Sequence, residues 1–210
     1  MAEVAGKSAI IKVSGTATSL SGEGLTRISN TEWQITTASK RVIDRAVNPT
    51  LQRETAPDTW ADVEYESVNK LNGKFTFAGS GYDATETIRV KATSPTAKYL
   101  PMSAATYAHE FSYSRGIDLM EVNKFGDSYK DRIPGTKFAS GTLSQWDVTS
   151  DYYKDALTAG NPVVIEFLHE TGADPIRVWA LLESVEMSAA IANPQDEVVS
   201  FISTDELLNN

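Results

Sequence analysis

The chain has 210 residues, no cysteine and a formal net charge of −9. The lack of cysteine excludes disulfides and thiolate metal sites, and hydrophobic and charged fractions of 41% and 22% are ordinary for a globular protein. No apolar run approaches the ~20 residues that cross a bilayer, and no signal-peptide core opens the chain, so we expect a cytoplasmic origin and no membrane partner.

The negative charge is concentrated in the last third of the chain. Residues 150–210 contain 11 acidic side chains and only two basic ones, Lys154 and Arg177. A surface of this kind repels phosphate, which disfavours tight binding of nucleic acid. The simplest alternative is a solvated acidic face that promotes solubility.

Taken in chain order, the pattern begins with a stretch rich in Ser, Thr and Gly. We predict that residues 1–30 form a flexible arm, 31–204 one β domain, and 205–210 a C-terminal tail. Short runs of β-branched and aromatic residues, separated by Gly, Pro, Asn and Asp, predict strands. These strands are 10–13, 33–36, 42–45, 63–68, 74–77, 87–92, 109–114, 138–143, 163–168, 176–182, 184–190 and 198–203.

A single helix is predicted between the strands near residue 150. Ser150 is a suitable N-cap, and Gly160 stands where a C′ residue belongs. Its apolar face is expected to consist of Tyr153, Ala156 and Leu157. The long segment 116–136 is weakly periodic and is predicted to be a loop. The fold class is therefore mainly β, a β-sandwich or barrel with one flanking α-helix and a long assembly loop.

The sequence contains no recognisable catalytic arrangement. The two histidines, His109 and His169, lack ligand-like spacing, so a structural role is expected for each. No Gly-x-Ser-x-Gly elbow is present. Paired acids such as Glu64 and Glu66 could serve a glycoside hydrolase only if held about 5–10 Å apart, which the sequence does not establish. We therefore expect no enzymatic activity, no cofactor and no metal.

Four tryptophans support one alternative function, a monomeric carbohydrate-binding β-sandwich module. Such a module requires tryptophans aligned on one exposed face. In an all-β chain, however, tryptophans more often anchor cores and interfaces.

Several stretches in order resemble the major tail tube proteins of long-tailed phages. Trp33-Gln-Ile-Thr-Thr-Ala-Ser-Lys-Arg-Val-Ile-Asp-Arg looks like their opening strand pair, although Ile43 stands where that family often has tryptophan. Val68-Asn-Lys-Leu-Asn-Gly-Lys-Phe-Thr-Phe is similar to a hairpin of the family. The remaining matches are Tyr99-Leu-Pro-Met, Gly126-Asp, Arg132-Ile-Pro-Gly, Phe138-Ala-Ser-Gly-Thr-Leu, Tyr152-Tyr-Lys-Asp-Ala-Leu-Thr-Ala-Gly-Asn-Pro-Val-Val and Glu197-Val-Val-Ser-Phe.

The resemblance implies a structural virion protein, made in the host cytoplasm and located in the virion tail. Such proteins self-assemble into stacked hexameric rings that form the tail tube, the conduit for DNA ejection. The implied partners are further copies of the chain, a tape measure protein, and tail terminator or baseplate proteins. DNA would pass through without specific binding. The same fold looks like that of contractile-tail tubes and of the type VI secretion tube.

Two sets of candidate residues follow for such an assembly. Acidic and hydroxyl side chains would line the lumen, because an acidic wall repels the phosphate backbone within a Debye length of ~8–10 Å. The lumen candidates are Glu64, Glu66, Ser184, Glu186 and Ser188. The last three alternate with Val185 and Met187 and are therefore expected on one face of a strand. Apolar residues of the 116–136 segment would order only between subunits. The interface candidates are Leu119, Met120, Val122, Phe125 and Tyr129.

Overall fold

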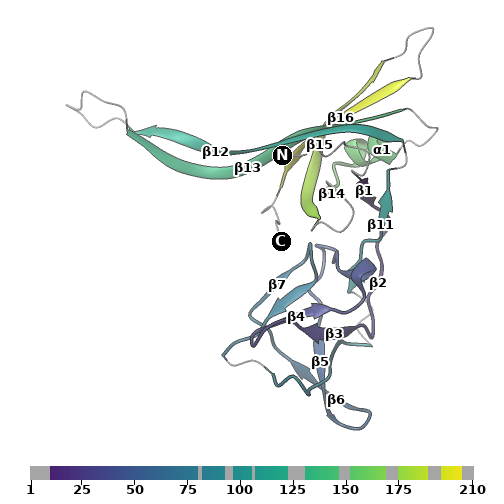
Figure 1. Ribbon diagram of the computed structural model, residues 1–210, viewed down its shortest axis with the longest axis vertical. Coiled ribbons are helices and arrows are strands. Elements are labelled where there is room, and N and C mark those ends of the chain that lie inside the picture. Colours follow the sequence, from purple (N-terminus) through teal and green to yellow (C-terminus); the bar gives the residue numbers. More distant parts are fainter. Residues whose placement is uncertain are drawn as a thin grey trace, which may run out of the picture. The chain divides into compact units, whose positions relative to one another are not determined.

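The computed structural model describes residues 10–79, 82–92, 97–105, 107–122, 131–146, 152–168, 175–188 and 195–204. The chain divides into two compact units, of which unit 1 comprises Met1–Val13 with Ala104–Asn210 and unit 2 comprises Ser14–Ser103. The mainly β fold with one α-helix is the predicted class (Figure 1). No described helix is long and apolar enough to cross a membrane.

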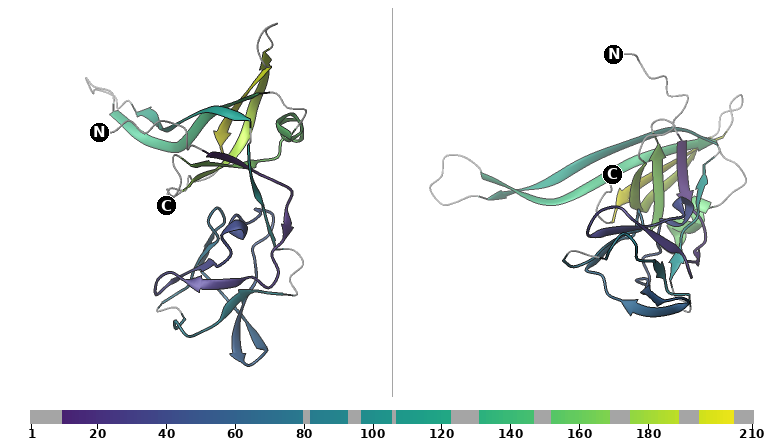
Figure 2. Two further views of the ribbon diagram at one scale, coloured as in Figure 1. Left: turned by 45° about the vertical axis from the view of Figure 1, so that its right-hand side comes forward. Right: turned by 60° about the horizontal axis from the view of Figure 1, so that its bottom comes forward.

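Unit 1 is built on a seven-stranded sheet with the order β11-β1-β14-β15-β16-β13-β12. Figure 2 shows that the strands of this sheet curve. Its strands are β1 (Ile10–Ser14), β11 (Met102–Ala104), β12 (Ala108–Val122), β13 (Asp131–Trp146), β14 (Val163–Leu168), β15 (Ile176–Ser188) and β16 (Asp196–Ser203). Alternate residues of these strands bury one apolar face, which includes Ile165, Phe167, Val178, Val199 and Phe201.

The predicted helix is confirmed as α1 (Tyr152–Ala159). Gly160 has a φ of 64°, the left-handed conformation expected of a C′ glycine, and its amide donates to the Leu157 carbonyl at 3.1 Å. Tyr153 is buried, while Ala156 and Leu157 pack against the core of unit 1. The helix therefore covers the apolar side of the sheet with the face that its spacing predicts.

One long strand replaces the two that were predicted at 176–182 and 184–190. The register of β15 against β16 shifts between Leu182 and Ser184. A β-bulge of this kind inserts one extra residue and interrupts the alternation without ending the strand. The interruption in the pattern therefore indicates a bulge rather than a turn.

The segment 116–136 is not the predicted long loop. Its described residues belong to β12 and β13, which pair antiparallel as far as Val122 and Asp131. The register shifts between Ile117 and Leu119, and this irregularity removes the period-two pattern that would have indicated strands. The prediction of an irregular loop was therefore wrong for residues 116–122 and 131–136, which are paired strands, while residues 123–130 lie outside the described residues.

Unit 2 contains a seven-stranded sheet, with the order β6-β5-β9-β3-β4-β8-β7, and a separate pair of strands, β10 and β2. Its strands are β2 (Thr18–Ser19), β3 (Gly24–Arg27), β4 (Glu32–Ile35), β5 (Leu51–Ala56), β6 (Thr59–Val63), β7 (Ser67–Asn69), β8 (Lys74–Thr76), β9 (Ile88–Val90) and β10 (Lys98–Tyr99), with a 3-10 turn η2 at Ala38–Lys40. Its buried core includes Leu20, Trp33, Ile35, Phe75 and Ile88.

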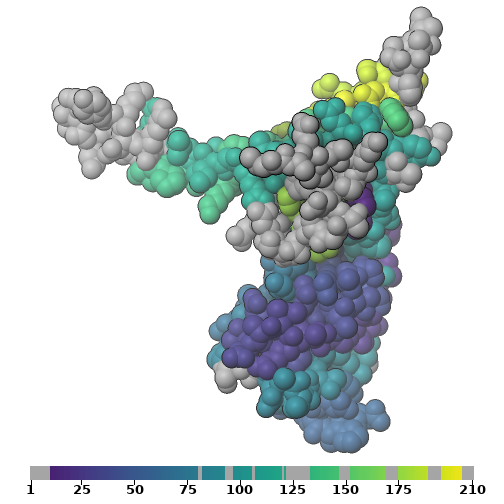
Figure 3. Space-filling model, in the orientation of Figure 1, coloured from purple at the N-terminus to yellow at the C-terminus, as the bar shows by residue number. Residues whose placement is uncertain are grey.

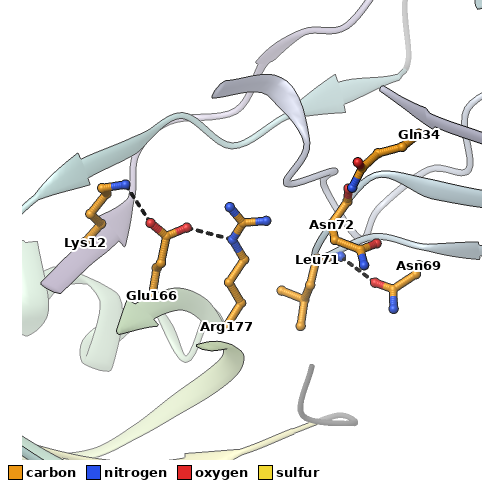
Figure 4. Close-up of polar contacts among 7 residues, drawn as sticks. All are labelled: Lys12, Gln34, Asn69, Leu71, Asn72, Glu166 and Arg177. Atoms are coloured by element: carbon orange, nitrogen blue, oxygen red, sulfur yellow. Dashed lines mark hydrogen bonds and ion pairs between the residues drawn. The ribbon is translucent and has the colours of Figure 1, made fainter. Parts of the chain in front are cut away.

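The hairpin expected around residues 68–77 is present in unit 2, where Val68 pairs with Phe75 across β7 and β8. Its turn is held by side-chain amides, since Asn69 accepts the Leu71 amide at 3.2 Å and the buried Gln34 donates to the Asn72 carbonyl at 2.8 Å (Figure 4). Gly73 has a φ of 64° in this turn, and an added Cβ would lie 2.8 Å from the Arg41 carbonyl oxygen. A glycine is therefore required there.

The structure also differs from the predicted domain boundaries. Residues 10–27, expected in a flexible arm, include β1, β2 and β3, and Leu20 is fully buried. The region predicted as one domain, 31–204, is divided between the two units. Residues 42–45 form no strand, and only Ile43 makes an isolated bridge, to Tyr99.

A buried carboxylate joins three neighbouring strands of unit 1. Glu166 on β14 accepts from Lys12 Nζ of β1 at 2.6 Å and from Arg177 Nε of β15 at 2.7 Å (Figure 4). Both partners lie directly across from Glu166 in the strand register. Burial alone raises the pKa of Glu166, but the hydrogen bonds and charges of Lys12 and Arg177 outweigh it and leave the pKa below its ordinary value of 4.5.

We predict that Glu166→Gln destabilises unit 1 by about 3 kcal/mol at pH 7, because it leaves Lys12 and Arg177 without the carboxylate between them. Because the folded-state pKa is lowered, the contribution of Glu166 is fully present above pH 4.5 and is lost as the pH falls through the folded-state value. Denaturant unfolding from pH 7 to pH 3 measures both effects. The exposed neighbour Glu183→Gln is the control, and equal losses for both variants would contradict the prediction.

Candidate assembly surfaces

One face of unit 1 carries small hydroxyl groups and carboxylates. On β12, β13, β16 and β15, the residues that alternate with the core residues point to the opposite face of the sheet. Ser112, Thr142, Ser200 and Ser184 lie in one row across these four strands, as successive cross-strand pairs. The hydroxyl and carboxyl side chains of this face, together called the polar face, belong to Glu110, Ser112, Ser114, Ser140, Thr142, Ser144, Glu183, Ser184, Glu186, Ser188, Asp196 and Ser200. The apolar Val198 and Ile202 alternate onto the same side of β16.

Hydrogen bonds between strands order the hydroxyl groups of this face. Ser112 and Thr142 lie 2.9 Å apart between their Oγ and Oγ1 atoms, and the Oγ atoms of Ser114 and Ser140 lie 3.4 Å apart. These short side chains fix their own donors and acceptors within the sheet. They therefore present short polar groups rather than long binding groups, and together with Glu183 they line a hollow of about 350 Å³.

The charge of the polar face is negative. Glu110, Glu183, Glu186 and Asp196 supply four carboxylates, and the set contains no lysine or arginine. His109 Nε2 lies 3.5 Å from Asp196 Oδ1, and the His109 ring stacks on Trp146 at 5.3 Å between centroids. This histidine contacts the rim of the face.

Close contact of β12 and β13 beneath the polar face depends on Gly141. A Cβ at this position would lie 2.2 Å from the Ser112 carbonyl oxygen and 2.7 Å from Cζ of Phe201. Only glycine fits between the backbone of one strand and a core ring of another. The pairing of Ser112 with Thr142 and the packing of Phe201 in the core therefore both require that residue 141 have no side chain.

The outer part of the hairpin forms a two-stranded ribbon. β16 pairs with β13 only from Ser140 to Trp146, so residues 115–122 and 131–139 pair only with each other among the described strands. Figure 3 shows the ribbon extending away from the sheet of its own unit. A two-stranded hairpin is at best marginally stable in water, so this part of the fold benefits from further contacts.

Large apolar side chains are exposed along the ribbon. Ile117 is 47% exposed, Leu119 55% and Ile133 49%. These three residues come from both strands, and each would gain free energy by burial against another surface. Leu119 pairs with Pro134 and Ile133 with Met120, so Leu119 and Ile133 lie on opposite faces of the ribbon. Exposed apolar side chains on both faces suit an element that is surrounded by another surface.

Of the five predicted interface residues, the structure describes the side chain of only one. Leu119 lies on the ribbon and is exposed. Met120 and Val122 are in β12, but their side chains lie outside the described residues, as do Phe125 and Tyr129. Sequence reasoning missed Ile117 and Ile133, although both are apolar residues within the segment that it had singled out.

The predicted lumen residues fall into two groups. Ser184, Glu186 and Ser188 share the polar face of β15, as their alternation predicted. Glu64 and Glu66 are exposed residues of the connection between β6 and β7 in unit 2, so the structure does not bring them into this face. Glu110, Glu183 and Asp196 were missed. Alternation with the core residues Phe111 and Val199 would have identified Glu110 and Asp196. Glu183 lies at the register shift of β15, where alternation is interrupted.

The described residues show no grouping of three or more histidine, aspartate or glutamate side chains able to hold a metal ion. Glu197 is buried and accepts from Gln145 Nε2 at 2.6 Å. Burial, followed by the neighbouring Tyr152 and Glu197, raises the pKa of Tyr153 far above its ordinary value, so this phenol stays neutral. Gln145 and Glu197 therefore satisfy each other, whereas the hydroxyl of Tyr153 is buried with no hydrogen-bond partner among the described residues.

The tryptophans do not form an aligned platform. Trp33 and Trp179 are buried in different units. Arg89 covers the ring of Trp60 at 3.5 Å, and Trp146 stacks against His109. A sugar-binding surface of several parallel exposed tryptophans is therefore not present on either unit.

No protein-family model and no curated protein matches the chain. Among solved structures, the chain is similar to a protein in the tail of an empty gene transfer agent particle with C6 symmetry, at 8% identity and a TM-score of 0.44, over 52% of this chain and 87% of that one. It is also similar to a chain from the virion of a native gene transfer agent particle, at 9% identity and a TM-score of 0.43, over 50% and 86%. Likeness at this level does not establish a common fold.

We predict that Gly141→Ala destabilises the chain by about 1–3 kcal/mol, because the new Cβ overlaps the Ser112 carbonyl and the Phe201 ring. Gly24→Ala is the control, since its Cβ would meet nothing closer than 3.9 Å. Denaturant unfolding of both variants measures the difference. A Gly141→Ala protein as stable as the control would show that the two strands can separate at no cost.

Proposed function

We propose that this chain is a structural subunit of a phage-type tail that self-assembles into stacked hexameric rings and forms the tube through which DNA leaves. In this proposal it acts in the virion tail and has no enzymatic activity. The observation that carries the proposal is the ribbon, which extends from the sheet with exposed apolar side chains on both of its strands. The ordered sequence resemblance to tail tube proteins agrees with it.

The ribbon suits contacts between copies of the chain. Ile117 and Leu119 on β12 and Ile133 on β13 are displayed on a narrow, extended element that a neighbouring subunit can surround. Burying a leucine or isoleucine contributes about 1.5–3 kcal/mol relative to leaving it exposed. Several such contacts, repeated around a closed ring by symmetry, give a stable assembly although each contact contributes little free energy.

The polar face suits the wall of a DNA channel. A channel wall must repel the phosphate backbone and must not offer lysine or arginine, which hold phosphates. The polar face meets both conditions over its described positions, with four carboxylates among hydroxyl groups that bond to each other. Glu64 and Glu66, in unit 2, remain a separate prediction for the lumen.

Electron microscopy of the purified chain tests the proposal directly. Rings or tubes are expected, with the polar face inward and the ribbon between subunits. Dispersed particles over a wide range of salt and concentration would instead support a monomeric binding module.

We predict that Ile117→Ser with Leu119→Ser raises the concentration needed for polymerisation at least tenfold, since about 1.4 kcal/mol corresponds to a factor of ten. Light scattering and sedimentation measure the threshold, and circular dichroism confirms folding. Ile28→Ser is the matched control, because Ile28 is 50% exposed in unit 2. Normal polymerisation of the double variant would show that the ribbon is not part of the interface between subunits.

We predict that Glu186→Lys slows DNA release from particles by a factor on the order of a few, because it places a cation where phosphates pass. Dye fluorescence of released DNA gives the rate at two salt concentrations, and the slowing should weaken at higher salt. Asp155→Lys, on the exposed side of α1, makes the same charge change away from the polar face. Equal rates for both variants would place Glu186 outside the channel.

A further inference from the structure

We propose that a second copy of this chain occupies a cationic groove on the ribbon, and that it does so with an acidic and aromatic patch at the opposite end of β12 and β13. The inference rests on the self-assembly proposed above and names the two surfaces that meet. Each copy carries both surfaces, so a single kind of contact can repeat from copy to copy.

The groove combines apolar and cationic side chains. It has a volume of about 1130 Å³, and its lining includes Ile117 and Leu119 together with Arg115 and Lys137. Its described lining contains no carboxylate, and Asp118 alternates onto the other face of β12. The groove therefore suits an occupant that is both apolar and negatively charged.

The patch lies where β12 begins and β13 ends, and we call it the end patch. It consists of Tyr107, His109, Glu110, Trp146 and Asp196. Tyr107 is 46% exposed and Trp146 48%. The His109 ring stacks on Trp146, and His109 Nε2 lies 3.5 Å from Asp196 Oδ1, so the tryptophan and the carboxylate are held side by side. The Asp196 side chain is 39% exposed, and Glu110 is a second exposed carboxylate.

The groove and the end patch of one copy cannot meet each other, because they lie at opposite ends of β12 and β13 (Figure 1). Lys137 alternates with the buried Ala139 and Leu143 on the core side of β13, whereas Trp146 lies on the polar side. Trp146 is nine positions after Lys137, which corresponds to about 30 Å along a strand. The contact must therefore join different copies. Since it pairs two unlike surfaces, it closes into a ring or continues as a filament.

Unit 2 shows within one chain the chemistry that this contact would use. Arg89 covers the Trp60 ring at 3.5 Å, and Lys91 Nζ lies 2.7 Å from Asp62 Oδ2. Two cations of one strand region thus meet a tryptophan and the carboxylate beside it. A cation over a tryptophan ring is attracted by the negative face of the ring.

The end patch offers the same pair of groups to a partner. Of the four tryptophans, all of which the structure describes, Trp146 is the most exposed. Asp196 and Glu110 stand beside it, so Arg115 and Lys137 of a second copy would meet a ring and carboxylates together. The exposed apolar side chains of the ribbon would cover the rest of the ring and gain free energy by burial.

Charge reversal on one copy at a time tests the contact. Lys137→Glu places like charges against Asp196, and Asp196→Lys does so against Lys137, so each variant alone should raise the polymerisation threshold about tenfold or more. An equimolar mixture of the two variants should polymerise near the wild-type threshold. When the two chains alternate, every groove meets an end patch of opposite charge.

Lys98→Glu in unit 2 and Asp155→Lys on α1 make the same charge changes at other exposed positions and are the controls. Sedimentation measures the threshold, and circular dichroism checks that each protein is folded. If the wild-type chain polymerises but the mixture stays dispersed, or if the single variants behave like the controls, the contact is overturned while the tube function stands.

Zero-length chemical coupling tests the contact without any substitution and without requiring tubes. It joins a lysine to a carboxylate in direct contact, and a mixture of isotopically light and heavy wild-type chains identifies links between copies by mass spectrometry. We expect mixed-isotope peptides that join Lys137 to Asp196 or Glu110. Links between copies that involve only other carboxylates, or no such links at high protein concentration, would overturn the contact whether or not tubes form.

Discussion

The antiparallel register of β13, with β12 on one edge and β16 on the other, determines what unit 1 presents to its surroundings. Side chains alternate along a strand, so a slip by one residue would exchange the core face and the polar face. The register places Leu143 and Val199 in the core while Thr142 and Ser200 face outward. Gly141 enforces this arrangement, because any side chain there would collide with both a backbone oxygen and a core ring.

The acidic excess near the C-terminus serves several physical roles. Glu166 is buried and neutralised by two cations, one from each neighbouring strand, where it holds β1 in the sheet. Glu197 is buried and bonded to Gln145. Glu183 and Glu186 instead remain on the exposed polar face. The net charge of the sequence therefore indicates the sign of a surface, but the partners of each carboxylate are visible only after folding.

Much of unit 1 could be predicted from local patterns. The helix was identified by Gly160 and by the spacing of Tyr153, Ala156 and Leu157, and β14 by a run that is apolar apart from Glu166. These signals are local, since each depends on capping or on burial of consecutive residues. The grouping of Ser184, Glu186 and Ser188 on one face followed in the same way from strict alternation.

The ribbon and the division into units could not be predicted in this way. Pro134 and Gly135 give the segment the composition of a loop, and the register shift next to Ile117 interrupts its alternation. The pairing of β12 with β13, which makes the described residues a hairpin, is not visible in either local pattern. β5 and β6 were missed because their residues are mostly polar and do not show the β-branched and aromatic runs that predict strands. The unit boundary has no Gly- or Pro-rich linker to mark it.

The position of unit 2 in the chain has a consequence for how this protein can vary. The chain leaves unit 1 after Val13 and returns at Ala104, and these points belong to neighbouring strands, joined by a hydrogen bond of 2.9 Å from the Ala105 amide to the Ile11 carbonyl. Topologically, Ser14–Ser103 thus occupies the place of a turn between β1 and β11. Insertions with adjacent ends are readily exchanged or lost without disturbing the host sheet. Selection can therefore remodel the inserted unit while the sheet that carries the ribbon and the polar face stays the same.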